Sequence, residues 1–426
     1  MRLQKNEISP FRLFLALSLV CLILFALMLP WLGQKGMDWV VMENNSDFEA
    51  ADYTLCQLFA LCGDEVYHCG VDACYSPLAY GFFALFNKIG GLDRLLADVD
   101  VAGLSYQEMI ALTGDILAMP YQMLTYLMYI LFGVLLYLLA VDTLDIGKTG
   151  RRLLALTIVC SVPLLFGAAE RGNLTLYVAA MALLAFRWKD DESPVKRELA
   201  LLLIAAAAGL KFYPAFLGLL YLQEKRWKEA ARLIVYGALF VFVPFAVYGG
   251  VDGLLSLLRN LSQLSASTSY SHRIQFFQGL VTFVLPQKAG KLLSPFFLLA
   301  LFVLFFGSRN RVRRATYLAA MLALFPPNSY RYMLLFFLLP LFAWIEDEGS
   351  SKSKGEYVTA VLFGLVFSVP VFFGILTGFR LNFGYYALTY VEVFVYLAAW
   401  ALLGYQVIRG LIQWRNERKM CRANAV

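Results

Sequence analysis

Long apolar stretches recur along this 426-residue chain, and short polar loops separate them. Several approach the roughly 20 residues that a helix needs to cross the hydrocarbon core of a bilayer. They include residues 13–31, 126–141, 233–248 and 386–407. The pattern therefore predicts an all-α fold and a polytopic membrane protein. The first stretch leads into a polar loop without a small-residue cleavage site, so we expect it to be a retained anchor.

Two further apolar segments are short for a membrane crossing. Residues 153–168 and 173–186 hold about 16 and 14 residues, or roughly 24 and 21 Å as helix, against a core of about 30 Å. The pattern predicts a helical hairpin that turns at Glu170-Arg171-Gly172-Asn173.

Two other hairpins are predicted from interrupted apolar segments. Residues 199–222 contain Lys211-Phe212-Tyr213-Pro214 in their middle, and proline disfavours a continuous helix there. Residues 317–345 turn at residues 325–331. Irregular backbone at membrane depth persists only where protein buries it or water reaches it. We therefore expect the three turns to share one polar cavity.

Charged residues in the loops predict which way the chain crosses the membrane, because loops rich in Lys and Arg face the cytoplasm. Basic loops lie at residues 2–12, 148–152, 187–197, 225–232, 309–314 and 409–422. The loop from Leu32 to Ala73 has eight acidic residues and only Lys35 as a base. It should lie outside, with both termini and the basic loops in the cytoplasm.

Composition agrees with one continuous membrane domain over residues 1–426. The chain is 60% hydrophobic and only 15% charged, and its mean hydropathy is +0.66. Residues 32–76 and 250–287 should be extracytoplasmic segments within it. The net charge of +6 lies in short loops, so it reflects topology and indicates no nucleic-acid partner.

Arg171 and Lys211 need a reason to lie within the predicted membrane segments, because an isolated cation there costs about 3 kcal/mol. One explanation is a structural ion pair with Glu170. The other is an anionic ligand, since Arg171, Lys211 and Arg331 outnumber Glu170 at the three turns. Phosphate suits this imbalance, because Arg offers a planar fork and Lys a point charge. Helices beginning near Asn173 and Pro214 would add backbone donors.

The outer loop offers carboxylates for acid–base chemistry. Asp38 follows the first apolar stretch, and Asp47 precedes a predicted helix from Phe48 to Leu61. A carboxylate at the mouth of the cavity suits a general base, although Asp47 also fits as a helix N-cap. For Glu49 and Asp52 we expect a solvated helix face.

Four cysteines lie in or just after the outer loop: Cys56, Cys62, Cys69 and Cys74. An even number in an oxidising compartment indicates two disulfides. Of three possible pairings we favour Cys62 with Cys69 nested inside Cys56 with Cys74. A zinc site with His68 is the weaker alternative, because the spacings contain no CxxC element.

The second outer segment has an amphipathic leucine pattern between residues 252 and 264, typical of helices lying on a membrane surface. It also holds His272. This histidine is either an acid, base or phosphate ligand, or an ordinary interfacial residue.

Three motifs carry a family resemblance. Glu170-Arg171-Gly172-Asn173 precedes an apolar run, Ala208-Gly209-Leu210-Lys211-Phe212-Tyr213-Pro214 follows, and Lys225-Arg226-Trp227 comes next. Weaker matches are Asp47-Phe48, Tyr75-Ser76-Pro77-Leu78 and Ser329-Tyr330-Arg331-Tyr332. The chain thus resembles the multi-spanning GT-C glycosyltransferases, in particular glycosyltransferase family 87, the DUF2029 group. It departs from them in its longer, cysteine-bearing outer loop and in Ser76.

The resemblance implies a bundle of roughly 10 to 13 membrane-crossing or half-crossing helices. It implies inverting transfer of a sugar, mannose-like in the favoured case, from a polyprenyl-phosphate carrier to a lipid or glycan hydroxyl outside the cell membrane. Asp47, or Asp38, would be the base. The donor phosphate would lie among Glu170, Arg171, Asn173, Lys211, Tyr213, Tyr330 and Arg331. No cofactor or metal is required.

Two alternatives stay open on the sequence alone. A transporter or flippase of an anionic lipid-linked sugar would also need embedded cations and broken helices. A polysaccharide polymerase or ligase with a diphosphate-linked donor is the other. Only the enzymes require the acidic outer loop.

Overall fold

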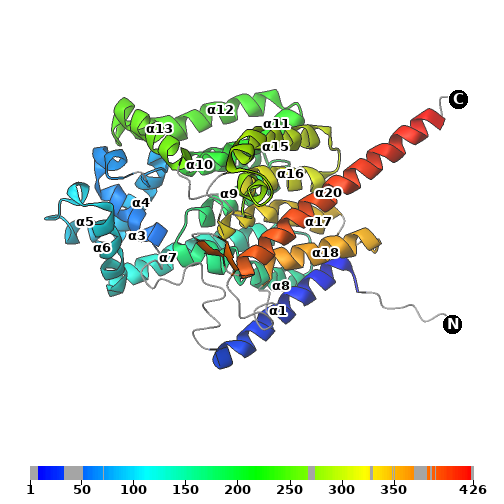
Figure 1. The fold of residues 1–426 in the computed structure, drawn as a ribbon, viewed down its shortest axis with the longest axis horizontal. Coiled ribbons are helices and arrows are strands. Elements are labelled where there is room, and N and C mark those ends of the chain that lie inside the picture. The colour runs from blue at the N-terminus through cyan, green and yellow to red at the C-terminus, as the bar shows by residue number, and fades with distance from the viewer. Residues whose placement is uncertain are drawn as a thin grey trace. The chain divides into compact units, whose positions relative to one another are not determined.

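The computed structural model describes residues 8–32, 51–70, 72–266, 274–326, 330–347, 349, 351–368, 381–383, 386–388 and 390–423. The chain forms two compact units. Figure 1 labels their helices and strands. Unit 1 combines residues 1–40, 144–162 and 271–426, and unit 2 combines residues 41–143 and 163–270. Whether they act as one domain, as the sequence analysis expects, stays a prediction.

Unit 2 is built of helices. Its α-helices are α3 (Ala51–Leu61), α4 (Pro77–Gly90), α5 (Leu92–Leu95), α6 (Tyr106–Ala118), α7 (Pro120–Asp142), α9 (Thr175–Trp188), α10 (Pro194–Leu210), α11 (Leu219–Gln223), α12 (Trp227–Phe242) and α13 (Gly250–Ala266). Its short 3-10 and π turns are η2 (Gly63–His68), η3 (Val101–Gly103), η4 (Leu164–Ala169), η5 (Tyr213–Gly218) and η6 (Val243–Ala246).

Unit 1 is also helical, apart from one small hairpin. Its helices are α1 (Pro10–Leu32), α8 (Lys148–Val159), α14 (Phe277–Val281), α15 (Gln287–Gly307), α16 (Arg311–Ala323), η8 (Arg331–Phe337), α17 (Leu338–Asp347), α18 (Lys354–Phe367) and α20 (Tyr390–Ala423). Strands β1 (Leu381–Phe383) and β2 (Tyr386–Leu388) pair antiparallel.

Six helical runs in the described residues are long and apolar enough to cross a bilayer. They are Pro10–Met28, Pro120–Asp142, Lys148–Ala169, Trp227–Ala246, Gln287–Gly307 and Val393–Met420. The prediction of an all-α, polytopic membrane protein is therefore confirmed. Two boundaries differ from the sequence pattern. Residues 153–168 belong to a run long enough to cross, and part of the predicted span 386–407 is strand β2.

The centre of unit 2 is helix α9, which packs between α7 and α10. Eleven of its fourteen residues are buried, as expected for a short helix that is apolar on all sides. Close packing requires Gly133 on α7, where a Cβ atom would lie 2.5 Å from the Leu176 side chain. The short helix is thus held by protein on every side.

Ion pairs join the two loops at one end of unit 2. Lys189 is buried and lies 2.6 Å from both Asp190 and Glu224, while Arg226 reaches Asp190 at 2.9 Å. Arg226 Nη1 also donates to the Lys189 carbonyl at 3.0 Å. The basic motif at residues 225–227 therefore stabilises the connection between the α9–α10 and α11–α12 loops.

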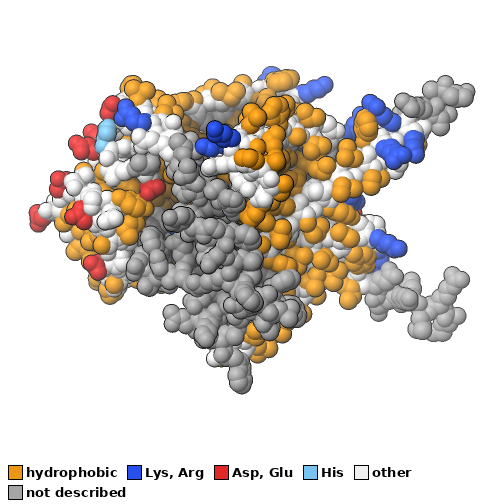
Figure 2. All heavy atoms as spheres, viewed as in Figure 1, with side chains coloured by type: hydrophobic (Ala, Val, Ile, Leu, Met, Phe, Trp, Pro, Cys, Tyr) orange, Lys and Arg blue, Asp and Glu red, His pale blue; other side chains and the backbone are white. Residues whose placement is uncertain are grey.

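Acidic side chains gather on the visible face of unit 2 near α5 and α6 (Figure 2). Helix α6 begins with a capping box, in which the Ser105 and Glu108 side chains satisfy each other's backbone amides. Residues 92–118 thus form two short helices, α5 and α6, with the turn η3 between them.

In unit 1, α16 and α17 pack against each other, and α18 packs against both α1 and α20. Glu356 on α18 is buried, accepts a hydrogen bond from Trp344 Nε1 at 2.9 Å, and pairs with Arg409 at 2.7 Å. One carboxylate thereby links α17, α18 and α20.

We predict that Gly133→Ala destabilises the protein by roughly 1 to 3 kcal/mol, because the new methyl group overpacks the α7–α9 contact. Thermal unfolding in detergent measures the loss. Gly404→Ala is the matched control, since a Cβ at Gly404 within α20 meets nothing within 4 Å. Equal melting temperatures for both variants would contradict the packing argument.

Candidate functional site

The turn at residues 170–173 reverses the chain before α9 and presses against α3. Gly172 has φ +63°, and a Cβ atom there would overlap the Cβ of Tyr53. Tyr126 of α7 donates its hydroxyl to the Ala169 carbonyl and, at 2.9 Å, to the Glu170 carbonyl. Glycine is therefore needed at residue 172 for its conformation and for this close approach.

Docking of the turn places Arg171 beside Asp52, in the first turn of α3. Arg171 Nε and Nη2 donate to the two carboxylate oxygens at 3.2 and 3.0 Å. This fork geometry orients both side chains more firmly than a single contact does. Arg171 and Asp52 are 15% and 20% exposed, so solvent still reaches the pair.

Asn173 is the central residue of the cluster. Its Nδ2 donates to Asp52 Oδ2 at 2.7 Å and to the Tyr75 hydroxyl at 3.2 Å. Its Oδ1 accepts from the Thr175 amide at 2.9 Å and from Lys211 Nζ at 2.7 Å. The buried amide thus joins three segments that are distant in the sequence.

Lys211 enters the cluster from the end of α10. Its backbone is extended, with φ −144° and ψ 131°, so α10 stops at this residue. Nζ donates to Asn173 and, at 3.0 Å, to Thr175 Oγ1. It also lies 5.0 Å from the ring centre of Tyr75 and 5.9 Å from that of Tyr213, within cation–π range.

Asp52 and Lys211 lie outside the six candidate spans. Burial alone would raise the pKa of Asp52, but Arg171, Asn173 and Lys211 together outweigh it, so the net shift is downward. Burial lowers the pKa of Lys211 to about 8, against the opposing effect of Asp52. The carboxylate is therefore ionised at neutral pH, and the lysine charge is sensitive to its surroundings.

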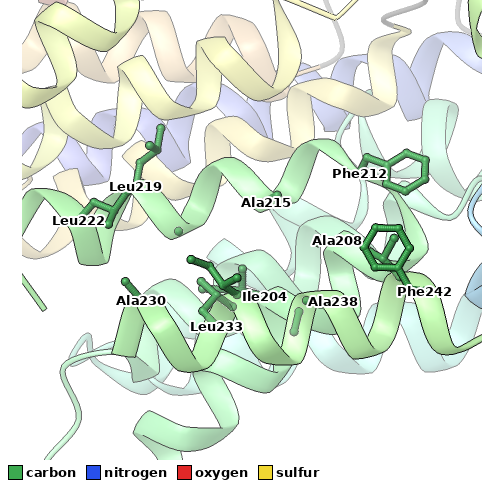
Figure 3. Close-up of a pocket in the computed structure, with 15 residues that line it drawn as sticks. Ile204, Ala208, Phe212, Ala215, Leu219, Leu222, Ala230, Leu233, Ala238 and Phe242 are labelled. Atoms are coloured by element: carbon green, nitrogen blue, oxygen red, sulfur yellow. The ribbon is translucent and has the colours of Figure 1, made fainter. Parts of the chain in front are cut away.

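An apolar groove lies next to the cluster, and Phe212, the residue after Lys211, is part of its lining. It has a volume of about 480 Å³ and lies between α10, the η5–α11 segment and α12 (Figure 3). Phe212 and Phe242 lie near one end, and Leu222 and Ala230 near the other. Between them the walls carry small residues, including Ala208, Ala215, Gly218 and Ala238. Several α12 side chains are more than half exposed, among them Ile234 and Phe242 of the groove.

The structure brings together several predicted residues, namely Arg171, Asn173, Lys211 and Tyr213, whose hydroxyl lies 3.3 Å from Thr175 Oγ1. Glu170 belongs to the same turn. Tyr330 and Arg331 lie in unit 1, where Arg331 is fully buried at the start of η8. Asp38, Asp47 and His272 fall outside the described residues.

Asp52 corrects the sequence analysis, which expected a solvated helix face and an excess of cations. Its carboxylate pairs with Arg171 and brings a second acid to the cluster besides Glu170. Tyr75 and Thr175 were missed as well. Two features of the sequence could have indicated Asp52. Arg171 needs a counter-charge, and Asp52 stands at the start of an apolar helix. Which acid meets Arg171 depends on contacts between distant segments.

Four cysteines between residues 56 and 74 are free thiols in the structure: Cys56, Cys62, Cys69 and Cys74. Cys62 and Cys69 nevertheless contact each other, as the inner pair of the nested arrangement would. The two disulfides stay a prediction. Within the described part of the chain no group of three or more His, Cys, Asp or Glu side chains could hold a metal ion.

Fold and cluster together define a helical membrane protein with a polar site at its short-helix turns. A family model matches residues 109–337, more than half of the chain, and its description is glycosyltransferase family 87. The chain therefore belongs to glycosyltransferase family 87. The match includes Arg171, Asn173 and Lys211 but begins after α3. Comparisons with curated proteins and with solved structures gave no match.

We predict that the Asp52–Arg171 pair stabilises the fold at neutral pH and loses this effect in acid. The folded-state pKa of Asp52 is below its ordinary value of 3.8, so the contribution is present above that value and lost as pH falls through the folded pKa. Asp52→Asn should cost roughly 1 to 3 kcal/mol at neutral pH, less than a fully buried pair because solvent reaches it.

The difference in melting temperature between wild type and Asp52→Asn should narrow as pH falls from about 7 to about 3. Asp115→Asn, at an exposed aspartate of α6, serves as the control. A difference that stays constant over this range would show that the charge of Asp52 does not stabilise the fold.

Proposed function

We propose that this glycosyltransferase takes its sugar from a polyprenyl-phosphate carrier and transfers it to a hydroxyl on the outer face of the membrane. The favoured sugar is a mannose-like hexose, and the acceptor is a lipid or a glycan. One observation carries the choice of donor: Lys211 reaches into the polar cluster, and the next residue, Phe212, lines the apolar groove. An anionic head with an isoprenoid tail has this division of polarity.

The polar part of the donor would bind at the cluster. Lys211 contributes a charge held by the neutral oxygens of Asn173 and Thr175, which leaves its attraction for a phosphate intact. Arg171 adds a second cation, which Asp52 keeps in a fixed orientation. Because Asp52 neutralises the charge of Arg171, Lys211 is the principal phosphate ligand of the cluster.

The tail of the donor would lie in the groove. Helix α12 belongs to a candidate membrane span, Trp227–Ala246. Its exposed apolar side chains, such as Val235 and Leu239, therefore suit contact with lipid. The groove is open on this side and walled by alanines and glycines. A hydrocarbon tail can therefore enter it from the bilayer without passing through water.

The basic loops at one end of α9 support the proposed outward orientation of the site. The helix begins at Thr175 in the cluster and ends at Trp188 beside the Lys189–Arg226 network. Fourteen residues place these ends about 21 Å apart. Because basic loops face the cytoplasm, the cluster belongs toward the outer face.

In the proposed reaction the acceptor oxygen attacks the anomeric carbon as the bond from that carbon to the phosphate oxygen breaks. A carboxylate of the outer loop accepts the acceptor's proton, and the phosphate leaves with the electron pair, stabilised by Lys211 and Arg171. A single displacement inverts the anomeric centre. Asp47 and Asp38 are the proposed bases. Asp47 is five residues before Asp52, which keeps their Cα atoms within roughly 18 Å.

We predict that head and tail contacts separate kinetically. Lys211→Met should raise the KM for donor about 10- to 100-fold, the loss of a charge-assisted hydrogen bond, whatever the length of the carrier. Ala215→Phe should fill the groove and raise KM for a long polyprenyl carrier while leaving a short-chain carrier unaffected. Transfer of radiolabelled sugar in detergent measures both.

Val235→Phe is the matched control, because Val235 lies on α12 and does not line the groove. It should leave both carriers unaffected. If Ala215→Phe impaired long and short carriers equally, or neither, the groove would have no role in holding the tail. A donor panel with nucleotide and diphosphate-linked sugars tests the carrier class itself, and exclusive use of either would disprove the proposal.

We further predict that Asp47→Asn or Asp38→Asn reduces kcat for transfer by a factor of about 10² to 10⁴, the usual contribution of a general base, without weakening donor binding. Single-turnover transfer and equilibrium binding of the donor measure the two effects. Asp64→Asn in η2 is the control for a change of charge in the outer loop. Full transfer by both variants would exclude these two residues as the base.

A further inference from the structure

Unit 1 contains a polar cavity of its own. It has a volume of about 490 Å³ and lies between the first turn of α16 and the C-terminal half of α20. Its lining includes Arg313, Gln406, Arg409, Gln413 and Glu417. Neither the family match nor the proposed reaction gives this cavity a role.

Two buried donors of this cavity have no acceptor among the described residues. Arg313 is 8% exposed, and its Nε has no hydrogen-bond partner there. Gln406 is 1% exposed, and its Nε2 likewise has none. A buried donor left without an acceptor costs about 1 to 3 kcal/mol, so two on one cavity need an explanation.

The charge of Arg313 is met by a neutral group. Its Nη2 donates to Gln413 Oε1 at 2.5 Å, and no carboxylate lies within salt-bridge distance of it in the described chain. Arg409, by contrast, pairs with buried Glu356 at 2.7 Å. Gln413 in turn donates a hydrogen bond from Nε2 to the Glu417 carboxylate at 2.8 Å. Glu417, the acidic residue of the lining, thus forms its hydrogen bond at the exposed edge of the cavity.

The packing of α20 on α16 holds the guanidinium at the cavity. A Cβ atom at Gly410 would lie 3.6 Å from Arg313 Cδ and 3.7 Å from its Nη1. These are ordinary van der Waals distances, so the α20 backbone at Gly410 runs beside the arginine side chain. The Tyr317 hydroxyl of α16 donates to the Gln406 carbonyl at 3.4 Å, which joins the same two helices. The cavity wall is fixed on both sides.

We propose that this cavity binds a phosphate group, with Arg313 and Gln406 as its ligands. An oxyanion accepts from both unsatisfied donors and balances the guanidinium charge, which a water molecule does not do. Arg418 and Lys419 add positive field on the exposed last turns of α20. Because α20 is a candidate membrane span, the headgroup of an anionic phospholipid is the favoured source, and a soluble phosphate has the same chemistry.

Native mass spectrometry of the full chain in detergent tests the site with phosphatidylglycerol, phosphatidylcholine and inorganic phosphate as probes. We expect retention of phosphatidylglycerol over phosphatidylcholine. Arg313→Gln and Gln406→Leu should each weaken it about tenfold. Gln406→Leu keeps the side-chain volume, so it tests the donor where removal of the arginine disturbs folding. Arg415→Gln removes one exposed cation of α20 as the control and should change retention less than twofold.

Competition separates the two sources. Inorganic phosphate that binds in place of phosphatidylglycerol, with the same dependence on Arg313 and Gln406, would support a soluble ligand in the same site. Equal retention of both lipids without phosphate binding would overturn the proposal. So would losses in Arg415→Gln as large as those in Arg313→Gln, because they would indicate general attraction to a basic surface.

Discussion

The hydrogen bonds of Asn173 hold the site together, because one buried amide satisfies a carboxylate and an ammonium at the same time. Its Nδ2 binds Asp52 of α3, and its Oδ1 binds Lys211 at the end of α10. No side chain with only donors or only acceptors can join these two charges. Arg171, Thr175 and the tyrosines are arranged around this amide, so their positions depend on it.

The amide is in place because a short helix begins beside it. Helix α9 is buried on all sides, and Gly172 lets the preceding turn press against Tyr53. The same end of the fold has a polar cluster at Lys211 and an apolar groove at Phe212. The end of α10 thus separates a polar site, suited to a charged head, from an apolar groove, suited to a hydrocarbon chain. We regard this division as the basis of the proposed use of a lipid-linked donor.

Charge balance differs between the two polar regions of the molecule. In unit 2 the cations face acids or amides at short distance. The pKa of Asp52 falls because its partners outweigh burial, and the pKa of Lys211 falls because burial outweighs the effect of Asp52. In unit 1 the buried Arg313 faces the neutral Gln413. The first arrangement resembles a prepared site that exchanges one partner for a substrate. The second has two buried donors, on Arg313 and Gln406, that have no acceptor among the described residues. This arrangement suits a permanently bound anion.

The sequence by itself determined the membrane class, the hairpin turns at residues 170–173 and 211–214, and the position of Arg171, Asn173 and Lys211 at these turns. These features follow from local patterns. An apolar segment in water, a proline within a helix and an unpaired charge in the membrane each carry a large free-energy cost. It did not determine that Asp52 is the partner of Arg171, or that Tyr75 and Thr175 line the cluster. Arg171 and Asp52 are 119 positions apart in sequence, Asn173 and Tyr75 are 98 apart, and Lys211 and Thr175 are 36 apart. Only the tertiary packing of these segments selects the contacts, and a local pattern carries no information about that packing.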